Sequence, residues 1–320
     1  MKVCITGAGG FIGSYLCKTL EAQNIDIFRW SVKKPDDLGE CNILVHLAAR
    51  AHQMKDAAKD PIEEYRKTNR DLTFQLARTA LKTNVQKFIF ISTVKVVGEK
   101  PGIYDLESQC DPSDPYGISK KEAEDGLKEL FINQSTIKCI ILRLPLVYGP
   151  GNKGNMLTLL KAAEKRIPLP LASVKNQRSM ISVSNVCDAI ITAINDAKLN
   201  RSQFRTYFLT DGRDLTSGEL YSTIYHSLNG KKGIFAFLLS LLEFTGTAGS
   251  FLEYIFGKKI PLNRETISRL LDEYKFDSVE FQNDYNWLPP VLPEDSIQET
   301  VQWFLMEKHK SHIIKKQRIA

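Results

Sequence analysis

A tyrosine and a lysine lie four residues apart in the stretch DPYGISK, as Tyr116 and Lys120. On a helix this spacing places the two side chains on the same face, one turn apart. An unperturbed phenol has a pKa near ~10, too high for ready proton exchange at neutral pH. A nearby ammonium favours the phenolate, so we expect Lys120 to lower the pKa of Tyr116 by roughly 1–3 units. The pair predicts a general acid/base, although the spacing alone also arises by chance in many helices.

A hydroxyl side chain supports the catalytic interpretation. Thr93 ends the apolar run KFIFIST, which is typical of a buried strand. Ligands of open parallel sheets bind at the carboxyl ends of the strands. We therefore expect Thr93 and Tyr116 to hydrogen-bond the same substrate oxygen while a hydride moves to or from the attached carbon.

Three glycines at three-residue intervals form a second motif, as Gly7, Gly10 and Gly13 in ITGAGGFIGSYL. They stand between a predicted strand and a predicted helix. Glycine allows a tight turn, a close approach of the backbone to a pyrophosphate, and close packing of helix on strand. The helix N-terminus adds free N–H groups and a positive dipole. The motif predicts dinucleotide binding in preference to a purely structural turn.

The end of the second predicted strand favours NADP(H) over NAD(H). In NAD-selective proteins of this layout, an acidic residue at that place accepts hydrogen bonds from the ribose 2′-OH. Here the strand ends in DIFRWSVKK, so Arg29 and Ser31 occupy the region, and the nearest acids lie beyond Pro35. A guanidinium pairs well with a 2′-phosphate. The alternative is that these charges are solvated and have no ligand.

Short apolar runs alternate with helix-like stretches through the first half of the chain: KVCIT, DIFRW, NILVHLA, KFIFIST and KCIILRL. Strands that are apolar throughout indicate a parallel sheet covered by helices on both faces. We predict an α/β fold, a Rossmann-type doubly wound parallel sheet with a smaller, discontinuous C-terminal substrate lobe. Residues 1–150 are expected to form the NAD(P)-binding domain and 151–320 mainly the lobe, with segments at about 178–210 returning to the sheet. The later predicted elements are a strand at RTYFLTD and helices near 215–228, 234–244, 263–273 and 294–308.

Composition excludes several function classes. The net charge of +6 is spread thinly except in the tail KHKSHIIKKQR, which favours an anionic small ligand and predicts no nucleic-acid partner. The six cysteines have no metal-ligand spacing, so we predict reduced, mostly buried thiols and no metal. His46 lies in an apolar run and is interpreted as a packed core residue. With no secretory signal pattern, these features predict a cytoplasmic protein.

The most apolar stretch, residues 233–257, is interrupted by two glutamates and two glycines. A membrane span needs roughly 20 apolar residues without such breaks, so none is predicted. Two short buried helices are the preferred interpretation, and a membrane-surface or partner-docking segment is the alternative.

These motifs resemble the extended short-chain dehydrogenase/reductase family, in particular its nucleotide-sugar epimerases, dehydratases and reductases. TGAGGFIG is similar to the family's TGxxGFIG turn, HLAAR to its HxAA strand, KTNRDLT to a helix segment with an Asn, and RLPLVYGPG to the strand beside the nicotinamide. Besides the residues above, the resemblance implies cofactor contacts by Phe11, Ile12, Leu47, Ala48, Ala49, Asn69, Tyr116, Lys120 and Pro145.

The resemblance also implies substrate contacts. QRSMISVSNVCDAI is similar to a segment whose arginine contacts the nucleotide diphosphate, which implies that role for Arg178. The family's 4,6-dehydratases carry an acidic pair directly after the catalytic threonine, where this chain has Val94 and Lys95. Elimination then lacks an acid, which argues against a dehydratase, and Lys95 is expected to contact the substrate. Lys153 and Asn155 are further candidates, although they are equally well interpreted as plain loop residues.

The implied activity is oxidoreduction at C4 of a UDP-sugar in bacterial surface-polysaccharide synthesis. The leading hypothesis is a 4-keto-reductase of the UDP-N-acetylquinovosamine type, whose exchangeable cofactor agrees with NADP(H). The alternative is a UDP-glucose or UDP-N-acetylglucosamine 4-epimerase with tightly bound NAD. A non-catalytic dinucleotide-binding regulator is disfavoured because Thr93, Tyr116 and Lys120 are all present. Family members commonly dimerise across helices such as 61–82 and 117–132, so a homodimer is expected.

Overall fold

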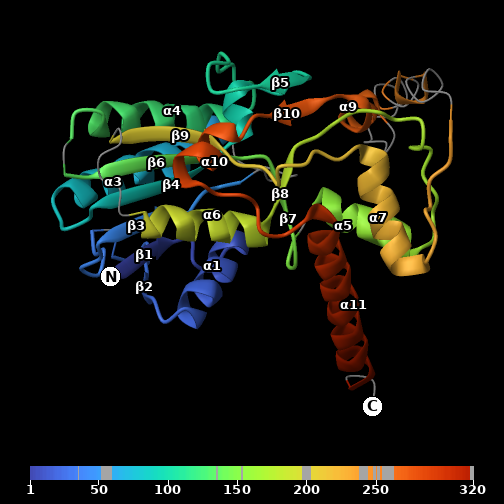
Figure 1. Cartoon of the computed structure of the whole chain (residues 1–320), viewed down its shortest axis with the longest axis horizontal. Helices are drawn as coiled ribbons and strands as arrows, with labels where there is room; N and C mark the ends of the chain where they lie inside the picture. The colour runs from blue at the N-terminus through green and yellow to red at the C-terminus, as the bar shows by residue number, and fades with distance from the viewer. Residues whose placement is uncertain are drawn as a thin grey trace.

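The computed structural model describes residues 1–34, 36–51, 60–134, 136–152, 154–196, 203–237, 244–247, 250, 253 and 263–317. Figure 1 shows a sheet between two layers of helices and, beside it, a smaller helical part from which the last helix extends. The predicted α/β architecture is confirmed.

Six parallel strands form the central sheet, in the order β2-β1-β3-β4-β6-β9. They are β1 Lys2–Thr6, β2 Asp26–Arg29, β3 Ile43–His46, β4 Lys87–Thr93, β6 Lys138–Leu144 and β9 Phe204–Phe208. Every predicted strand of the sheet is present. From β1 the chain first moves outward to β2 and then to β3 on the other side, so a crevice forms at the carboxyl ends of β1 and β3.

Alternation along the strands builds two apolar cores. Val3 and Ile5 of β1 belong to one core, whereas Cys4 between them belongs to the other. Successive side chains of a strand point to opposite faces, so a strand that is apolar throughout needs helices on both sides. The covering helices are α1 Phe11–Ala22 and α6 Val183–Asn195 on one face, and α3 Leu72–Leu81 and α4 Pro115–Phe131 on the other (Figure 1).

The predicted helix 61–82 is interrupted by a π-helical turn. It consists of α2 Pro61–Arg66, the π-helix η1 Lys67–Asp71, and α3. Leu72 N–H donates to Lys67 O, a hydrogen bond that spans five residues and replaces the four-residue pattern of an α-helix. Such turns are rare and frequently lie at functional sites. We call Lys67–Asp71 the π-turn.

The smaller part is a helical lobe. Its core joins α5 Asn155–Glu164, α7 Ser217–Asn229 and the first turns of α11 Pro293–Gln317. Between α5 and α7 the chain returns to the layered part, where it forms α6 and the edge strand β9. The remaining elements are α9 Arg264–Leu271, α10 Val279–Tyr285, the 3-10 turn η2 Val94–Val97, and two small sheets, β5 Gly102–Tyr104 with β10 Tyr274–Phe276 and β7 Leu146–Tyr148 with β8 Met180–Ser182.

Most of the apolar segment 233–257 lies outside the described residues. Where it is described, the predicted helix 234–244 is wrong at its start, because Ile234 forms a parallel bridge with Leu169 and residues 235–237 are not helical. Backbone pairing of Phe235 with Leu169 takes the hydrogen bonds that a helix would use. No helix within the described part of the chain is long and apolar enough to cross a bilayer.

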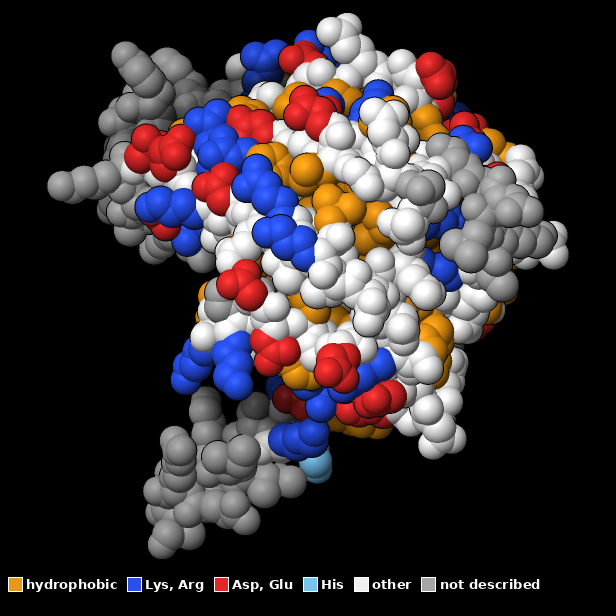
Figure 2. Space-filling model, turned by 90° about the vertical axis from the view of Figure 1, so that its left-hand side faces the viewer, with side chains coloured by type: hydrophobic (Ala, Val, Ile, Leu, Met, Phe, Trp, Pro, Cys, Tyr) orange, Lys and Arg blue, Asp and Glu red, His pale blue; other side chains and the backbone are white. Residues whose placement is uncertain are grey.

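All six cysteines are free thiols; five are buried and Cys110 is half-buried. Their burial confirms the prediction that the thiols are mostly buried. Figure 2 shows that acidic and basic side chains are interspersed over the face at the left-hand end of Figure 1.

Candidate active site

The predicted catalytic and cofactor residues gather at one edge of the sheet. Thr93 is the last residue of β4, Gly7 follows β1, Leu47 follows β3, and the buried Pro145 follows β6. Because the strands are parallel, their carboxyl ends share this edge. The N-terminus of α4 brings Tyr116 to the same place, where its hydroxyl group interacts with the Thr93 side chain.

The glycine turn leaves no room for side chains at two positions. Gly7 has a φ of +68°, and a Cβ on it would lie 2.7 Å from Ala48 N. A Cβ on Gly13 would lie 2.1 Å from Gly7 O. Glycine at these positions therefore lets the turn after β1 pack against both the loop after β3 and helix α1.

The N-terminus of α1 fits a dinucleotide diphosphate. Gly10 is the N-cap, no side chain caps the helix, and its first turn contains no acidic residue. A Cβ on Gly9 would meet no protein atom within 4 Å. The free N–H groups of this end, in the turn that begins with Phe11 and Ile12, are therefore open to an anion.

Arg29 and Ser31 lie at the end of β2 as predicted, but Arg29 already has a protein partner. Its Nη2 donates to Glu21 Oε1 at 2.7 Å, and its side chain is 56% exposed. Ser31 Oγ accepts from Lys33 N–H at 3.4 Å. A 2′-phosphate would have to share the Arg29 guanidinium with Glu21.

Thr6 fixes the loop after β3 to the glycine turn. Its Oγ1 accepts from Leu47 N–H at 3.1 Å and from Ala48 N–H at 3.0 Å. Ala49, the next residue, is exposed at the edge. His46 is 1% exposed and packs against Phe90, which confirms the interpretation of a core histidine.

Burial raises the pKa of Tyr116 to about 12; the charge of Asp114 adds to this rise, and the hydrogen bond from Thr93 opposes it. The predicted lowering by Lys120 is absent from the chain by itself, and it stays a prediction for the site that holds an oxidised, positively charged nicotinamide. Loss of solvent disfavours the phenolate more than nearby groups favour it. The Lys120 ammonium donates instead to Ile91 O at 2.6 Å, with its Nζ 3.7 Å from the centroid of the Phe90 ring.

Lys120 is itself perturbed. It is 1% exposed, and burial lowers its pKa to about 7, with the charge of Glu124 opposing the change. An amine with this pKa gains and loses its proton readily at neutral pH, which suits a group beside a proton carrier.

This shift predicts a pH dependence of stability. Between about pH 7 and pH 10.5 the unfolded chain keeps a proton on Lys120 that the folded chain has lost, so the free energy of unfolding rises with pH. In protein stripped of cofactor, we expect Lys120→Met to remove a slope of up to about 1.4 kcal/mol per pH unit. Urea unfolding at several pH values measures it. Lys128→Met, at an exposed position of the same helix, is the control and should keep the slope; an unchanged slope in Lys120→Met would contradict the assignment.

Lys95, predicted to contact substrate, is engaged with protein carboxylates. Its ammonium pairs with Glu99 at 2.8 Å and with Asp114. Asp114 is the N-cap of α4, and its Oδ1 accepts from Gly117 N–H at 2.6 Å. Lys95 therefore links the turn after Thr93 to the N-terminus of α4, the helix that carries Tyr116 and Lys120. Asp114 was not predicted, although an acidic residue directly before Pro115 is a recognisable helix start.

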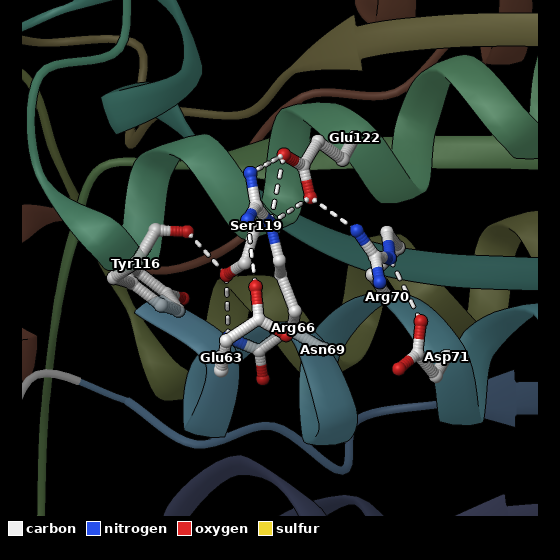
Figure 3. Close-up of polar contacts among 8 residues, drawn as sticks. All are labelled: Glu63, Arg66, Asn69, Arg70, Asp71, Tyr116, Ser119 and Glu122. Atoms are coloured by element: carbon white, nitrogen blue, oxygen red, sulfur yellow. Dashed lines mark hydrogen bonds and ion pairs between the residues drawn. The ribbon is translucent and has the colours of Figure 1, made fainter. Parts of the chain in front are cut away.

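Asn69, predicted to contact the cofactor, is wholly buried in the π-turn. Its Nδ2 donates to Arg50 O at 3.1 Å and to Ser119 Oγ at 3.0 Å, and its Oδ1 accepts from Arg50 N–H at 2.8 Å. Figure 3 shows Asn69 directed at Ser119 on α4. Any direct cofactor contact would have to replace one of these hydrogen bonds.

Tyr65 is a site residue that the motifs did not identify. It is 3% exposed, and its ring centroid lies 6.3 Å from that of Tyr116. Its place four residues before Asn69, on the same helical face, is the signal that could have found it.

Arg178 is linked to the site through the lobe. Its Nη1 donates to Asp272 O at 3.2 Å, and its guanidinium carbon lies 5.6 Å from the centroid of the Tyr274 ring. The Tyr274 hydroxyl group donates to Gly98 O, just after η2 and close in sequence to Thr93. Asn155 is exposed at the first residue of α5. Lys153 lies outside the described residues.

Within the described residues, no group of three or more His, Cys, Asp or Glu side chains could hold a metal ion.

Comparisons with known proteins identify the family of the chain. Residues 3–204 match the NAD dependent epimerase/dehydratase family. A UDP-glucose 4-epimerase of Vibrio cholerae is 31% identical, with 97% of each chain covered. An N-acetyl-α-D-glucosaminyl-diphospho-ditrans,octacis-undecaprenol 4-epimerase of Escherichia coli O157:H7 is 24% identical, with 98% of each covered.

A UDP-2-acetamido-2,6-β-L-arabino-hexul-4-ose reductase of Pseudomonas aeruginosa is 24% identical, covering 73% of this chain and 59% of the other. Among solved structures, a UDP-glucuronic acid 4-epimerase from Bacillus cereus in complex with NAD superposes with a TM-score of 0.70 at 19% identity, over 96% of this chain and 99% of the other. That likeness supports the fold.

Proposed function

The chain belongs to the NAD-dependent epimerase/dehydratase family, and on that premise we propose that it is a 4-epimerase of a sugar carried on a nucleotide diphosphate. The observation that carries the proposal is the meeting of the Thr93 and Tyr116 side chains at the sheet edge where the glycine turn opens, with the buried Lys120 one helical turn further along α4. The full-length relatives named as 4-epimerases favour epimerisation over the reduction that the sequence alone favours.

The proposed chemistry divides between the cofactor and the chain. NAD, when bound, supplies the acceptor and donor of the hydride at the sugar C4. Thr93 and Tyr116 both reach the oxygen on C4, so Thr93 holds the oxygen while Tyr116 takes its proton and later returns it. The turns that carry Gly7, Gly10 and Gly13 hold the pyrophosphate.

The pKa of Tyr116 indicates whether its hydroxyl group donates or accepts a proton in the free chain. With a pKa of about 12, Tyr116 is neutral in the free chain and is ready to donate a proton to a keto oxygen. Oxidation of a hydroxyl group needs the phenolate, which the positive charge of Lys120 favours once the site is filled. Arg178 is placed to clamp the diphosphate through charge-assisted hydrogen bonds.

A 4-keto-reductase is the second candidate. The end of β2 bears Arg29 and lacks an acidic residue, which suits an exchangeable NADP(H), and one relative is named as a reductase of a 4-keto sugar. The same Thr93, Tyr116 and Lys120 would serve either reaction, because both move a hydride and a proton at C4.

Release of the cofactor separates the two candidates. We expect denatured, freshly purified protein to release about one dinucleotide per chain, identified as NAD by enzymatic assay, and the native protein to interconvert UDP-glucose and UDP-galactose or their N-acetyl forms. A protein that emerges empty and oxidises NADPH only with a 4-keto sugar would establish the reductase instead. Protein that neither retains a dinucleotide nor turns over any of these sugars would overturn both.

A further inference from the structure

A chain of buried side chains connects the turn that carries the glycines with the backbone of the catalytic tyrosine. All members lie in the sheet or in the helices beside it, all but the half-buried Tyr116 are buried, and each is joined to the next by a hydrogen bond. The members are Thr6, His46, Thr73, Asn69, Ser119 and Tyr116.

The hydrogen bonds at Thr6 determine which ring nitrogen of His46 carries the hydrogen. Thr6 Oγ1 accepts from the N–H groups of Leu47 and Ala48, which occupies both of its lone pairs. Its own hydrogen must therefore go to His46 Nδ1, 2.6 Å away. The Nδ1 atom accepts, so the neutral ring carries its hydrogen on Nε2. Burial lowers the pKa of His46 to about 3, with the charge of Lys120 adding to the effect, so the ring stays neutral at working pH.

The hydrogen bonds continue in one direction from the histidine. His46 Nε2–H donates to Thr73 Oγ1 at 2.9 Å, and Thr73 Oγ1 donates to Asn69 O at 2.6 Å. Asn69 Nδ2 then donates to Ser119 Oγ at 3.0 Å, and Ser119 Oγ donates to Tyr116 O at 2.9 Å. Every donor has an acceptor, so no member can rotate without leaving a buried polar group unsatisfied.

The π-turn and the residue before it contact helix α4 at two points. On its inner side, Asn69 holds Ser119. On its outer side, the guanidinium groups of Arg70 and of Arg66, the last residue of α2, pair with the Glu122 carboxylate at 3.2 Å and 2.6 Å. Figure 3 shows Glu122 between the two arginines, with Asn69 and Ser119 nearer Tyr116.

The same network holds the loop that follows β3. Asn69 bonds both the N–H and the C=O of Arg50, while Thr6 bonds the N–H groups three and two residues before it. The loop predicted to line the cofactor is thus fixed at both ends by members of the chain that ends at Tyr116.

We propose that His46, Thr73 and Asn69 are positioning residues, which hold the catalytic helix and its tyrosine in register with the loops that bind the dinucleotide. The proposal rests on the proposed function only in taking Tyr116 as the proton carrier. His46 acts as a fixed, neutral connector from Thr6 to the π-turn, and its role is orientation.

Thr73 allows the sharpest test, because valine matches its shape and serine keeps its hydroxyl group. Thr73→Val leaves His46 Nε2–H without its acceptor, so the π-turn loses its link to β3. We expect kcat at saturating substrate to fall about tenfold or more, because a small displacement of a reacting group is costly, while KM stays within about twofold. Thr73→Ser should restore most of kcat.

Thr79→Val is the matched control. Thr79 lies on the same helix, is half-buried, and donates to Gln75 O at 3.0 Å in the same backbone pattern that Thr73 makes to Asn69. It should keep full kcat. A merely structural role of Thr73 would lower the melting temperature without lowering kcat per folded enzyme well below that temperature, and this result, or an inactive Thr73→Ser that is folded, would overturn the proposal.

A measurement without substrate distinguishes failure of this inference from failure of the proposed function. The chain has five histidines, so ¹⁵N NMR of the ring nitrogens can resolve His46 by comparison with His46→Gln. We expect a neutral ring with hydrogen on Nε2, unchanged from about pH 5 to 9. A hydrogen on Nδ1, or titration in that range, would sink the inference even if the sugar chemistry is correct; the expected tautomer in a protein inactive on all sugars would leave it standing.

Discussion

Tyr116→Phe is expected to lower kcat by about 10²- to 10⁴-fold, the usual worth of a positioned acid/base. The ring remains, and only the hydroxyl group beside Thr93 is lost. Binding of the dinucleotide should change little, because the glycine turn and the start of α1 are untouched. Steady-state kinetics with a UDP-sugar, together with the dinucleotide content of the purified variant, measure both quantities.

Tyr104→Phe provides the control for that substitution. Tyr104 lies in β5, its hydroxyl group donates to Lys100 O at 2.7 Å, and its ring stacks on Phe276. The variant should keep wild-type turnover. If Tyr116→Phe also kept it, the proton would have to pass through another group, and the assignment of the site would be wrong.

Gly13→Ala is expected to damage cofactor binding most severely. The added Cβ would stand 2.1 Å from Gly7 O and 2.9 Å from Ala8 Cα, both backbone atoms that can move only by distorting the turn. Overpacking of this kind costs about 1–3 kcal/mol, which corresponds to roughly 5- to 150-fold weaker dinucleotide binding if the distortion falls on the turn that holds the pyrophosphate. Calorimetric titration of stripped protein measures the affinity, and its melting temperature should also fall.

Gly9→Ala tests whether the effect comes from crowding within the chain. A Cβ on Gly9 meets no protein atom within 4 Å, and its backbone is not in the left-handed region. We expect affinity and stability within about twofold of the wild type. Equal damage by both substitutions would show that any side chain in this turn collides with the ligand, and would remove the packing explanation.

The sheet could be predicted from sequence because its signal is local. Runs such as KFIFIST and KCIILRL have apolar residues at successive positions, and therefore on both faces, a pattern that only strands buried on both faces need. The glycine turn was predictable for a similar reason, since Gly7 and Gly13 meet backbone that is near in sequence or joined through β1 and β3.

The π-turn could not be predicted in the same way. Residues 61–82 have a continuous helical pattern, and nothing in KTNRD indicates an additional residue in the turn. The turn is set by distant partners, because Asn69 bonds Arg50 and Ser119. The sequence pattern within the helix carries no information about these contacts, because the partners are distant in the chain.

The pKa shifts and the ion pairs of the site could not be predicted from the sequence either. The spacing of Tyr116 and Lys120 correctly placed both on one helix, but not the burial that raises one pKa and lowers the other. Lys95 shows the same limit, since its position after Thr93 suggested substrate, whereas Asp114 and Glu99 take its charge. Burial and pairing depend on which segments meet in space.

The edge strand β9 joins the sheet from a late part of the chain, so the first half of the chain cannot be expressed alone without losing it. Strand β9 pairs along β6, which is buried at all seven of its residues, although β9 is made from chain that follows helix α5 of the lobe. A fragment truncated after residue 150 would present β6 as a bare, apolar rim, the kind of surface that recruits other strands and aggregates. The nucleotide-binding half is therefore not a detachable module, and its solubility depends on residues encoded after the lobe has begun.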